Sequence, residues 1–272
     1  MESLYDDMRR MAKRMRLNAL KMAFHAGANG AHLGGGLSCM EIFAVLYRGV
    51  LKYDLSRPEW PERDRFLVSK AHCVLAYYTA LHEAGFITRE ALDSFEQNGT
   101  ELAGHPVSSL KNGIEYSGGS LGMAFSVGLG MAIDAKRKGR GNKVYVLLGD
   151  GECDEGSNWE AFLSAPHFKL DNLTAIIDWN HLQYDGNTTT VMDLGSLHKK
   201  LEVFGWNVIS VDGHDVQELY GAFTRKPISG APCAIIADTI KGKGVSFMES
   251  AKEWHHGVLT EKLYHQALEE IS

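Results

Sequence analysis

The sequence lacks an excess of basic residues and long apolar runs, and each absence removes a class of protein. Its 272 residues carry 28 Lys and Arg against 34 Asp and Glu, a formal net charge of −6. This balance offers no basic surface for nucleic acid, so local hydrogen-bond donors must hold any phosphate that the protein binds. No apolar stretch approaches membrane-spanning length. Neither a nucleic acid nor a membrane is therefore expected as a partner.

Cysteine pairs are also lacking. None of Cys39, Cys73, Cys153 and Cys233 belongs to a C-x-x-C motif, which argues against a zinc site and against a thiol redox centre. Unpaired cysteines fit a reducing compartment. Residues 1–16 mix acids and bases without an apolar core, unlike a signal peptide. These features favour a cytoplasmic protein.

The apolar residues that are present, 44% of the chain, fall into short runs between helical patterns. Such runs are typical of buried parallel strands. Strands are predicted at 63–69, 143–148, 173–179, 206–211 and 232–239, and helices at 3–28, 38–50, 73–84, 88–95, 124–135, 158–168, 194–204 and 261–271, with a further helix after a capping Asp215. This alternation predicts an α/β protein with three α/β/α layers around a mainly parallel central sheet, built as one domain over residues 1–272.

One segment, Lys143 to Gln183, combines two predicted strands with an oxygen-bearing side chain after each. Asp150 follows the first strand between two glycines, which let backbone N–H groups approach a phosphate, and Asn180 follows the second. Thirty residues separate them, as a strand-helix-strand crossover needs. Because ligands bind beyond the carboxyl ends of parallel strands, the carboxylate and the amide oxygen are predicted to meet there. Together they suit a hard divalent cation such as magnesium.

Four of the twelve histidines stand out because each lies beside glycine or at a predicted strand end. They are His32, His72, His105 and His256. Histidines so placed can donate hydrogen bonds to oxyanions and move protons near neutral pH. Most of the others fall on predicted helices and are interpreted as structural.

A run rich in glycine, residues 27–36, interrupts the helical pattern around His32. Glycine at this density suits a backbone that lies against a ligand. Ser38 and Glu41 then have the spacing of a capping box, so the next helix is predicted to begin at Ser38.

Several segments together resemble the cofactor-binding half of transketolases. The matching segments are Gly149–Gly156, Asp178–Leu182, Lys70–His72, Gly104–Pro106, Ser117–Met123 and Trp254–Gly257. The resemblance covers nearly the whole chain and implies the thiamine diphosphate-binding fold. Three motifs depart from the usual pattern: Ala71 replaces a glycine, Ala103 stands where Pro or Ser is commoner, and Met123 with Ala124 replaces a Gln-Gly pair.

The resemblance also implies a role for individual residues. Three histidines are expected to face the reacting sugar, namely His32, His105 and His256. Contacts to the cofactor are expected from His72, Gly119, Leu121, Gly149, Asp150, Gly151, Glu152, Asn180 and His256. The metal is expected on Asp150, Asn180 and Leu182. His256 is preferred to its neighbour His255 because it directly precedes Gly257.

The activity implied by the resemblance is transfer of a two-carbon ketol unit from a ketose phosphate to an aldose phosphate. It uses thiamine diphosphate and Mg²⁺, for which Ca²⁺ or Mn²⁺ can substitute. Full-length transketolases are more than twice as long, and a second domain supplies the glutamate that activates the cofactor. The chain is therefore expected to be the amino-terminal subunit of a split transketolase. It would be inactive without a separate carboxyl-terminal subunit, with which it would assemble as two copies of each.

Other interpretations remain open at this point. The chain could be half of a related thiamine diphosphate enzyme, similar either to deoxyxylulose-phosphate synthase or to a 2-oxoacid dehydrogenase. It could also be a cofactor-binding subunit without catalysis. Histidines placed for a polyhydroxylated sugar favour transketolase over both.

Overall fold

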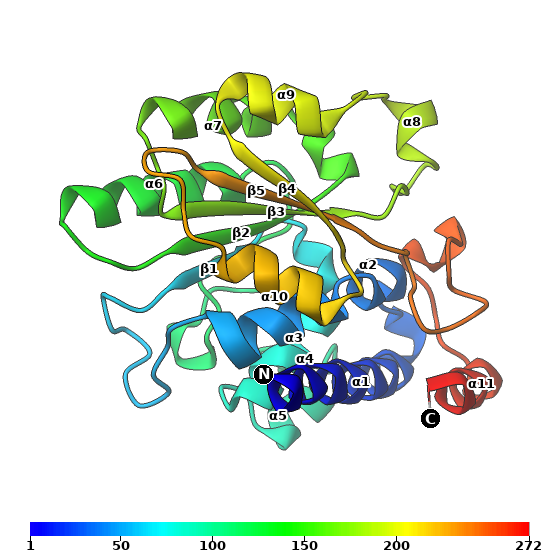
Figure 1. Ribbon diagram of the computed structural model, residues 1–272. Coiled ribbons are helices and arrows are strands. Elements are labelled where there is room, and N and C mark those ends of the chain that lie inside the picture. Colours follow the sequence, from blue (N-terminus) through cyan, green and yellow to red (C-terminus); the bar gives the residue numbers. More distant parts are fainter. Residues whose placement is uncertain (272) are drawn as a thin grey trace.

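A computed structural model describes residues 1–271, and its centre is a five-stranded sheet (Figure 1). The strands are β1 (Arg65–Val68), β2 (Val144–Gly149), β3 (Leu173–Trp179), β4 (Asn207–Asp212) and β5 (Cys233–Asp238). Their order across the sheet is β1-β2-β3-β5-β4, and every neighbouring pair is parallel. All five predicted strands are confirmed, with ends that differ by a few residues.

Helices precede the first strand, connect the strands and follow the last one. Their bounds are α1 (Glu2–His25), α2 (Leu33–Leu37), α3 (Met40–Val45), α4 (Val74–Ala84), α5 (Arg89–Asp93), α6 (Ala124–Arg137), α7 (Gly156–His167), α8 (Thr188–Val191), α9 (Leu197–Phe204), α10 (Val216–Thr224) and α11 (Glu261–Ile271). A π-helical turn, Leu46–Val50, extends α3 to the predicted end. Asp215 caps α10 by accepting hydrogen bonds from two backbone N–H groups, as predicted.

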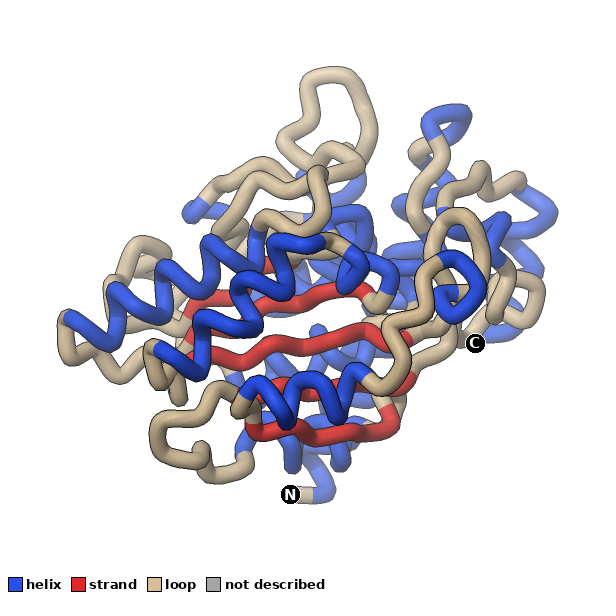
Figure 2. Tube along the Cα trace, turned by 90° about the horizontal axis from the view of Figure 1, so that it is seen from above, coloured by secondary structure: helices blue, strands red, loops and turns tan. Residues whose placement is uncertain are grey.

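Helices cover both faces of the sheet. In Figure 1, α6, α7 and α9 lie above it, and α1, α3 and α10 lie below it; Figure 2 shows the same layers from above. The strand residues whose side chains point upward, such as Val146 and Ile177, pack against the upper helices, whereas Leu147 and Ile176 belong to the larger lower core. Strands buried on both faces explain the continuous apolar runs, and the predicted three-layer α/β/α arrangement is confirmed.

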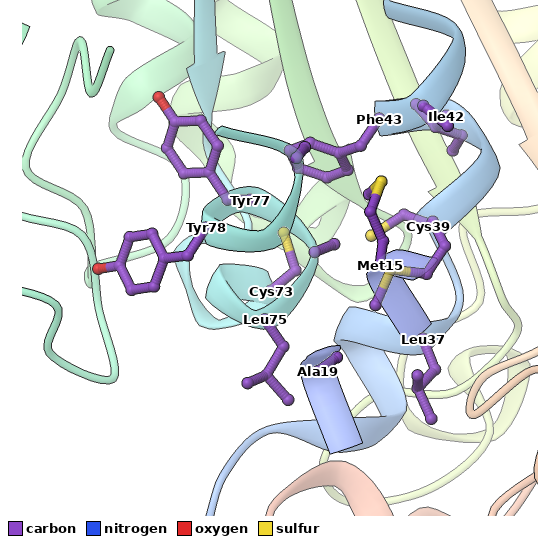
Figure 3. Close-up of a cluster of buried hydrophobic side chains, with 14 of the residues drawn as sticks. Met15, Ala19, Leu37, Cys39, Ile42, Phe43, Cys73, Leu75, Tyr77 and Tyr78 are labelled. Atoms are coloured by element: carbon purple, nitrogen blue, oxygen red, sulfur yellow. The ribbon is translucent and has the colours of Figure 1, made fainter. Parts of the chain in front are cut away.

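The lower core also places the segment that carries His105. Figure 3 shows part of this core, with Met15 and Ala19 from α1, Phe43 from α3 and Tyr78 from α4 among the labelled side chains. Tyr78 is at the edge of this cluster, and its hydroxyl donates a hydrogen bond to the Ala103 carbonyl at 2.9 Å. The methionine-rich face of α1 is thus core packing, and a buried α4 tyrosine anchors the chain next to the His105 loop.

The glycine-rich run is not only loop, because part of it forms the buried helix α2. A Cβ on Gly34 would lie 2.9 Å from the Trp254 carbonyl oxygen, and one on Gly36 would lie 3.1 Å from the Leu75 Cβ. A Cβ on Gly35 would lie 3.1 Å from the His72 ring. These glycines therefore let a helix pack closely against the segments around it, His72 included.

The predicted capping box is wrong. The helix α3 begins after Cys39, which makes no side-chain capping bond. Ser38 Oγ instead lies 2.7 Å from Asp178 Oδ2, and Glu41 forms an ion pair with Arg16. Tertiary contacts to buried charges thus take both side chains away from the helix end. No helix of the described chain is long and apolar enough to cross a membrane.

Candidate functional site

A cavity of about 340 Å³ lies at the carboxyl edge of the sheet. Eight residues predicted to contact a cofactor or a metal line it, namely His72, Leu121, Gly149, Asp150, Gly151, Glu152, Asn180 and Leu182. Gly149 ends β2, Leu121 precedes α6, and the others follow the adjacent strands β1, β2 and β3. The side chains predicted to meet beyond the carboxyl ends of the strands therefore line one cavity there.

Asp150, the first residue after β2, is 4% exposed. Its Oδ1 accepts a hydrogen bond from the Gly151 N–H at 2.8 Å, while its Oδ2 is buried without a hydrogen-bond partner. Burial, together with the nearby Asp178 carboxylate, raises the pKa of Asp150 to about 6. A buried acceptor without a partner destabilises a protein by about 1–3 kcal/mol, so this oxygen is suited to bind a cation.

Asn180 lies beyond the adjacent strand with its amide orientation fixed. Its Nδ2 donates to Asp178 Oδ2 at 3.0 Å, and its Oδ1 accepts from the Leu182 N–H at 3.2 Å. The Leu182 carbonyl accepts a hydrogen bond from Lys241 Nζ at 2.8 Å. Because Gly149 and Asp178 pair in the sheet, Asp150 and Asn180 follow neighbouring strand positions. The three predicted metal ligands are therefore all oxygen donors at one edge of the cavity.

Behind Asn180 lies a buried ion pair between Lys70 and Asp178, which are 1% and 0% exposed. The Asp178 carboxylate also accepts hydrogen bonds from the hydroxyls of Ser38 and Thr239. Burial opposes both charges, but each partner outweighs it, so the pKa of Lys70 is raised and the pKa of Asp178 is lowered. With Asn180, four donors hold this carboxylate, which makes the Asn180 support rigid.

The two glycines of the Gly-Asp-Gly motif both lie against other side chains, but only Gly151 is tightly packed. Lys70 follows β1 and reaches Asp178 on β3 by passing over β2 at Gly149, where a Cβ would lie 3.7 Å from the Lys70 Cβ. At Gly151 a Cβ would lie 2.6 Å from the Gln183 Cβ. The spacing at Gly149 is therefore ordinary van der Waals contact, whereas at Gly151 only glycine leaves room for Gln183 to pack beside Asp150.

Glu152 joins two segments of the cavity wall. Its Oε1 accepts hydrogen bonds from the Ser69 hydroxyl and, at 2.9 Å, from the Gly122 N–H. Its Oε2 accepts from the Gly149 N–H at 3.1 Å. Burial raises the pKa of Glu152. The carboxylate thus fixes the loop before α6, which places Leu121 in the cavity.

Two predicted cofactor contacts, Gly119 and His256, do not line the cavity, whereas His255, to which His256 was preferred, does. Gly119 is exposed, and a Cβ built on it would meet no atom within 4 Å. The neighbouring Gly118 is the tightly packed one, since its Cβ would lie 2.6 Å from the Cβ of Ala71. The departure at Ala71 is therefore accommodated by a glycine on the facing loop.

The predicted histidines gather around His32. Its ring centroid lies 5.5 Å from that of His72, 5.4 Å from that of His105 and 4.6 Å from that of His256. Burial, followed by the charges of neighbouring histidines, lowers the pKa of His32 to about 3. Burial also lowers the pKa of His72. At neutral pH these two rings are uncharged, so each can donate through one nitrogen and accept through the other.

Two further functional candidates are Lys241, which was not predicted from the sequence, and His255, to which His256 was wrongly preferred as a residue facing the cavity. Lys241 is 2% exposed, lines the cavity and places Nζ 3.0 Å from His255 Nδ1. Burial lowers the pKa of Lys241 to about 8 and that of His255 to about 4. The His255 ring also stacks on His72 at 5.0 Å between centroids. A lysine in a glycine-rich loop after a strand was the available signal.

These groups fit a metal held together with an anionic cofactor. Within residues 1–271 no group of three or more His, Cys, Asp or Glu side chains is placed to hold a metal ion. The donors are instead one carboxylate oxygen without a partner, one amide oxygen and one carbonyl, a set suited to a hard cation that keeps other ligands. Lys241 and the histidines supply donors for anionic oxygens.

Comparison with known proteins agrees with this chemistry. Residues 8–270 match the family described as transketolase, thiamine diphosphate binding domain. One subunit of the apulose-4-phosphate transketolase of Phocaeicola vulgatus is 43% identical over 90% of this chain and 87% of its own. The 6-deoxy-6-sulfo-D-fructose transketolase subunit SqwG of Clostridium is 41% identical over 88% of each.

Longer transketolases contain the same fold as one part. Human transketolase is 37% identical over 96% of this chain, which spans 41% of the human protein. The crystal structure of transketolase from Campylobacter jejuni superposes with a TM-score of 0.90 at 29% identity, over 98% of this chain and 43% of the bacterial one. Relatives of similar length are named as transketolase subunits. The chain therefore belongs to the transketolase family and corresponds to its thiamine diphosphate-binding part.

Proposed function

We propose that this chain is the amino-terminal subunit of a transketolase that moves a two-carbon ketol unit from a ketose phosphate to an aldose phosphate. The observation that carries the proposal is the buried Asp150 oxygen without a partner, beside an amide oxygen fixed on the next strand. Mg²⁺ would bind to Asp150, Asn180 and the Leu182 carbonyl. Thiamine diphosphate, when bound, would supply the carbanion that attacks the ketose carbonyl.

The residues of this chain would bind the ligands and move protons. His72 and Lys241 face the cavity and would donate to the diphosphate, with Gly149, Gly151 and Glu152 shaping the wall. His32, His105 and His256 form one cluster and would hold the sugar hydroxyls. A neutral imidazole can accept a hydroxyl proton and return it, so this cluster can serve both halves of a ketol transfer.

Relatives named as subunits support a partner. The matched relatives from Phocaeicola vulgatus and Actinobacillus succinogenes are each named as one subunit of a transketolase. We infer that a separate carboxyl-terminal chain completes the site with the glutamate that activates the cofactor, in an assembly of two copies of each chain. Relatives named for apulose 4-phosphate and a sulfonated fructose widen the sugars to be tested beyond common ones.

The test combines the chain with its partner subunit, thiamine diphosphate and Mg²⁺. Xylulose 5-phosphate, apulose 4-phosphate and 6-deoxy-6-sulfofructose are offered separately as ketoses with an aldose phosphate acceptor, and pyruvate is the control donor. Turnover of a ketose that stops when EDTA removes the metal is the expected result. Turnover of pyruvate alone would favour a different thiamine diphosphate enzyme, and binding of the cofactor without any turnover would favour a non-catalytic subunit.

A further inference from the structure

A second buried charged cluster, made of Arg16, Glu41 and His214, lies outside the proposed chemistry. Arg16 is on α1, Glu41 is on α3, and His214 lies between β4 and α10. The Arg16 guanidinium donates two hydrogen bonds to Glu41, at 2.5 Å and 2.7 Å. His214 Nδ1 lies 3.1 Å from the second Glu41 oxygen. One carboxylate, 8% exposed, therefore binds two basic side chains from different elements.

Both basic side chains also bind the loop that carries Lys241. His214 Nε2 accepts a hydrogen bond from the Ile240 N–H at 2.9 Å, just before the lysine. Arg16 Nε donates to the Lys243 carbonyl at 3.3 Å, just after it. Because Nε2 of His214 is an acceptor, its ring proton is on Nδ1 and is donated to the carboxylate. The loop is thus held on both sides of Lys241 by groups that one carboxylate orients.

The same loop has little freedom elsewhere. Gly242 has a φ of +81°, and a Cβ there would lie 2.2 Å from the Met248 carbonyl oxygen. Its N–H donates to the Gly34 carbonyl at 3.0 Å. The Lys241 side chain leaves this backbone to reach the Leu182 carbonyl and His255. The position of the loop backbone therefore decides where the Lys241 ammonium sits in the cavity.

We propose that Glu41 is a positioning residue, which acts through Arg16 and His214 to hold residues 240–243 and so to place the Lys241 ammonium against the bound anion. The identity of that anion as a diphosphate rests on the proposed function, whereas the placement of the loop does not. A cluster that touches no ligand would then determine cofactor affinity, as residues that orient ligating groups do in other sites.

The test compares Glu41→Gln with Glu115→Gln in the whole chain assembled with its partner subunit. Glu115 is a matched control, because its side chain is 5% exposed and also pairs with two arginines, Arg63 and Arg65, beside the amino end of β1. Amide hydrogen exchange at residues 240–244 and the calorimetric affinity for thiamine diphosphate with Mg²⁺ are measured for each. Glu41→Gln is expected to speed exchange there and to weaken binding about tenfold, whereas Glu115→Gln changes neither.

Two substitutions of His214 separate positioning from general stability. In His214→Gln the amide can accept from the Ile240 N–H and donate to Glu41, so affinity is expected to stay within about threefold of the natural chain. His214→Leu loses both bonds and is expected to bind about tenfold more weakly.

Equal effects of Glu41→Gln and Glu115→Gln, or equal effects of the two His214 variants, would overturn the positioning role. Failure of the natural chain, assembled with its partner subunit, to bind thiamine diphosphate at all, with exchange still accelerated by Glu41→Gln, would overturn the proposed function while supporting the role of Glu41 in holding the loop.

Discussion

The two oxygens of Asp150 have different surroundings, and the difference predicts an unusual pH dependence of stability. Burial raises the pKa of Asp150 to about 6, above its value of about 3.9 in an unfolded chain. The folded chain therefore binds this proton more tightly, and its free energy of unfolding falls as pH rises from about 4 to about 6. About two pKa units correspond to roughly 2–3 kcal/mol.

Asp150→Asn should remove this destabilisation and should also abolish metal binding. Without metal, at a pH of about 8, the variant is expected to be more stable than the natural chain by roughly 2 kcal/mol, and the gain should vanish at a pH of about 4. Its metal-dependent affinity for thiamine diphosphate should be lost. Urea denaturation in EDTA and calorimetric titration measure the two effects. A variant that binds the cofactor normally would contradict the ligand assignment.

His105 is exposed on its loop but lies 5.4 Å from His32 between ring centroids, which suits contact with a sugar. His105→Ala should spare cofactor binding and reduce turnover by about two to four orders of magnitude, the scale of general acid–base catalysis. Steady-state kinetics with the partner subunit would measure the loss. His198→Ala, at an exposed histidine on α9, is the control, and an equal effect of both would make His105 merely structural.

Among single residues, the sequence predicts the side chains that follow strands but not the buried groups that hold them in place. Asp150 and Asn180 could be predicted because the ends of parallel strands meet at one edge. The pair of Lys70 and Asp178 spans three strands, so only the fold brings it together. Asp178 did leave a signal, since it is an acid within an apolar run, and a charge buried in a strand needs a partner.

Among the elements, all five strands could be predicted from their apolar runs. Burial on both faces explains these runs in β2, β3 and β5, whereas β4, at the edge of the sheet, is only partly buried. The helix α2 was missed because three of its five residues are glycine, which disfavours a helix in isolation. Close packing against Trp254 and Leu75 outweighs that preference. Short elements that depend on tertiary contacts are therefore the part of this fold that local patterns cannot predict.

Two glycines of α6 give a matched test of packing. A Cβ on Gly128 would lie 2.5 Å from Val146 Cγ2 on β2, whereas a Cβ on Gly130 would meet nothing within 4 Å. Gly128→Ala should lower the free energy of unfolding by about 1–3 kcal/mol, because the helix must move off the sheet. Gly130→Ala should raise it by about 0.5–1 kcal/mol, the helix preference of alanine. Urea denaturation of the chain measures both, and equal signs would contradict the packing.

The active site of the whole molecule is expected to need a second chain. The chain spans 41% of human transketolase but 87% of the Phocaeicola vulgatus relative that is named as a subunit. Alone, with thiamine diphosphate, Mg²⁺ and a ketose phosphate, it should show no steady turnover. Adding the partner subunit should restore activity that saturates at one partner per chain, as measured by a coupled assay and by sedimentation. Steady turnover by the single chain would refute the split arrangement.

The oxygen of Asp150 that has no partner would also make the folded fraction of this protein depend on the supply of its ligands. A chain that is destabilised by its own carboxylate and stabilised by its ligands folds more completely as the concentration of those ligands rises. Cells deprived of the vitamin precursor would hold more of the unfolded form, and proteases would remove it faster. The abundance of the subunit would then follow the coenzyme supply without any dedicated regulator.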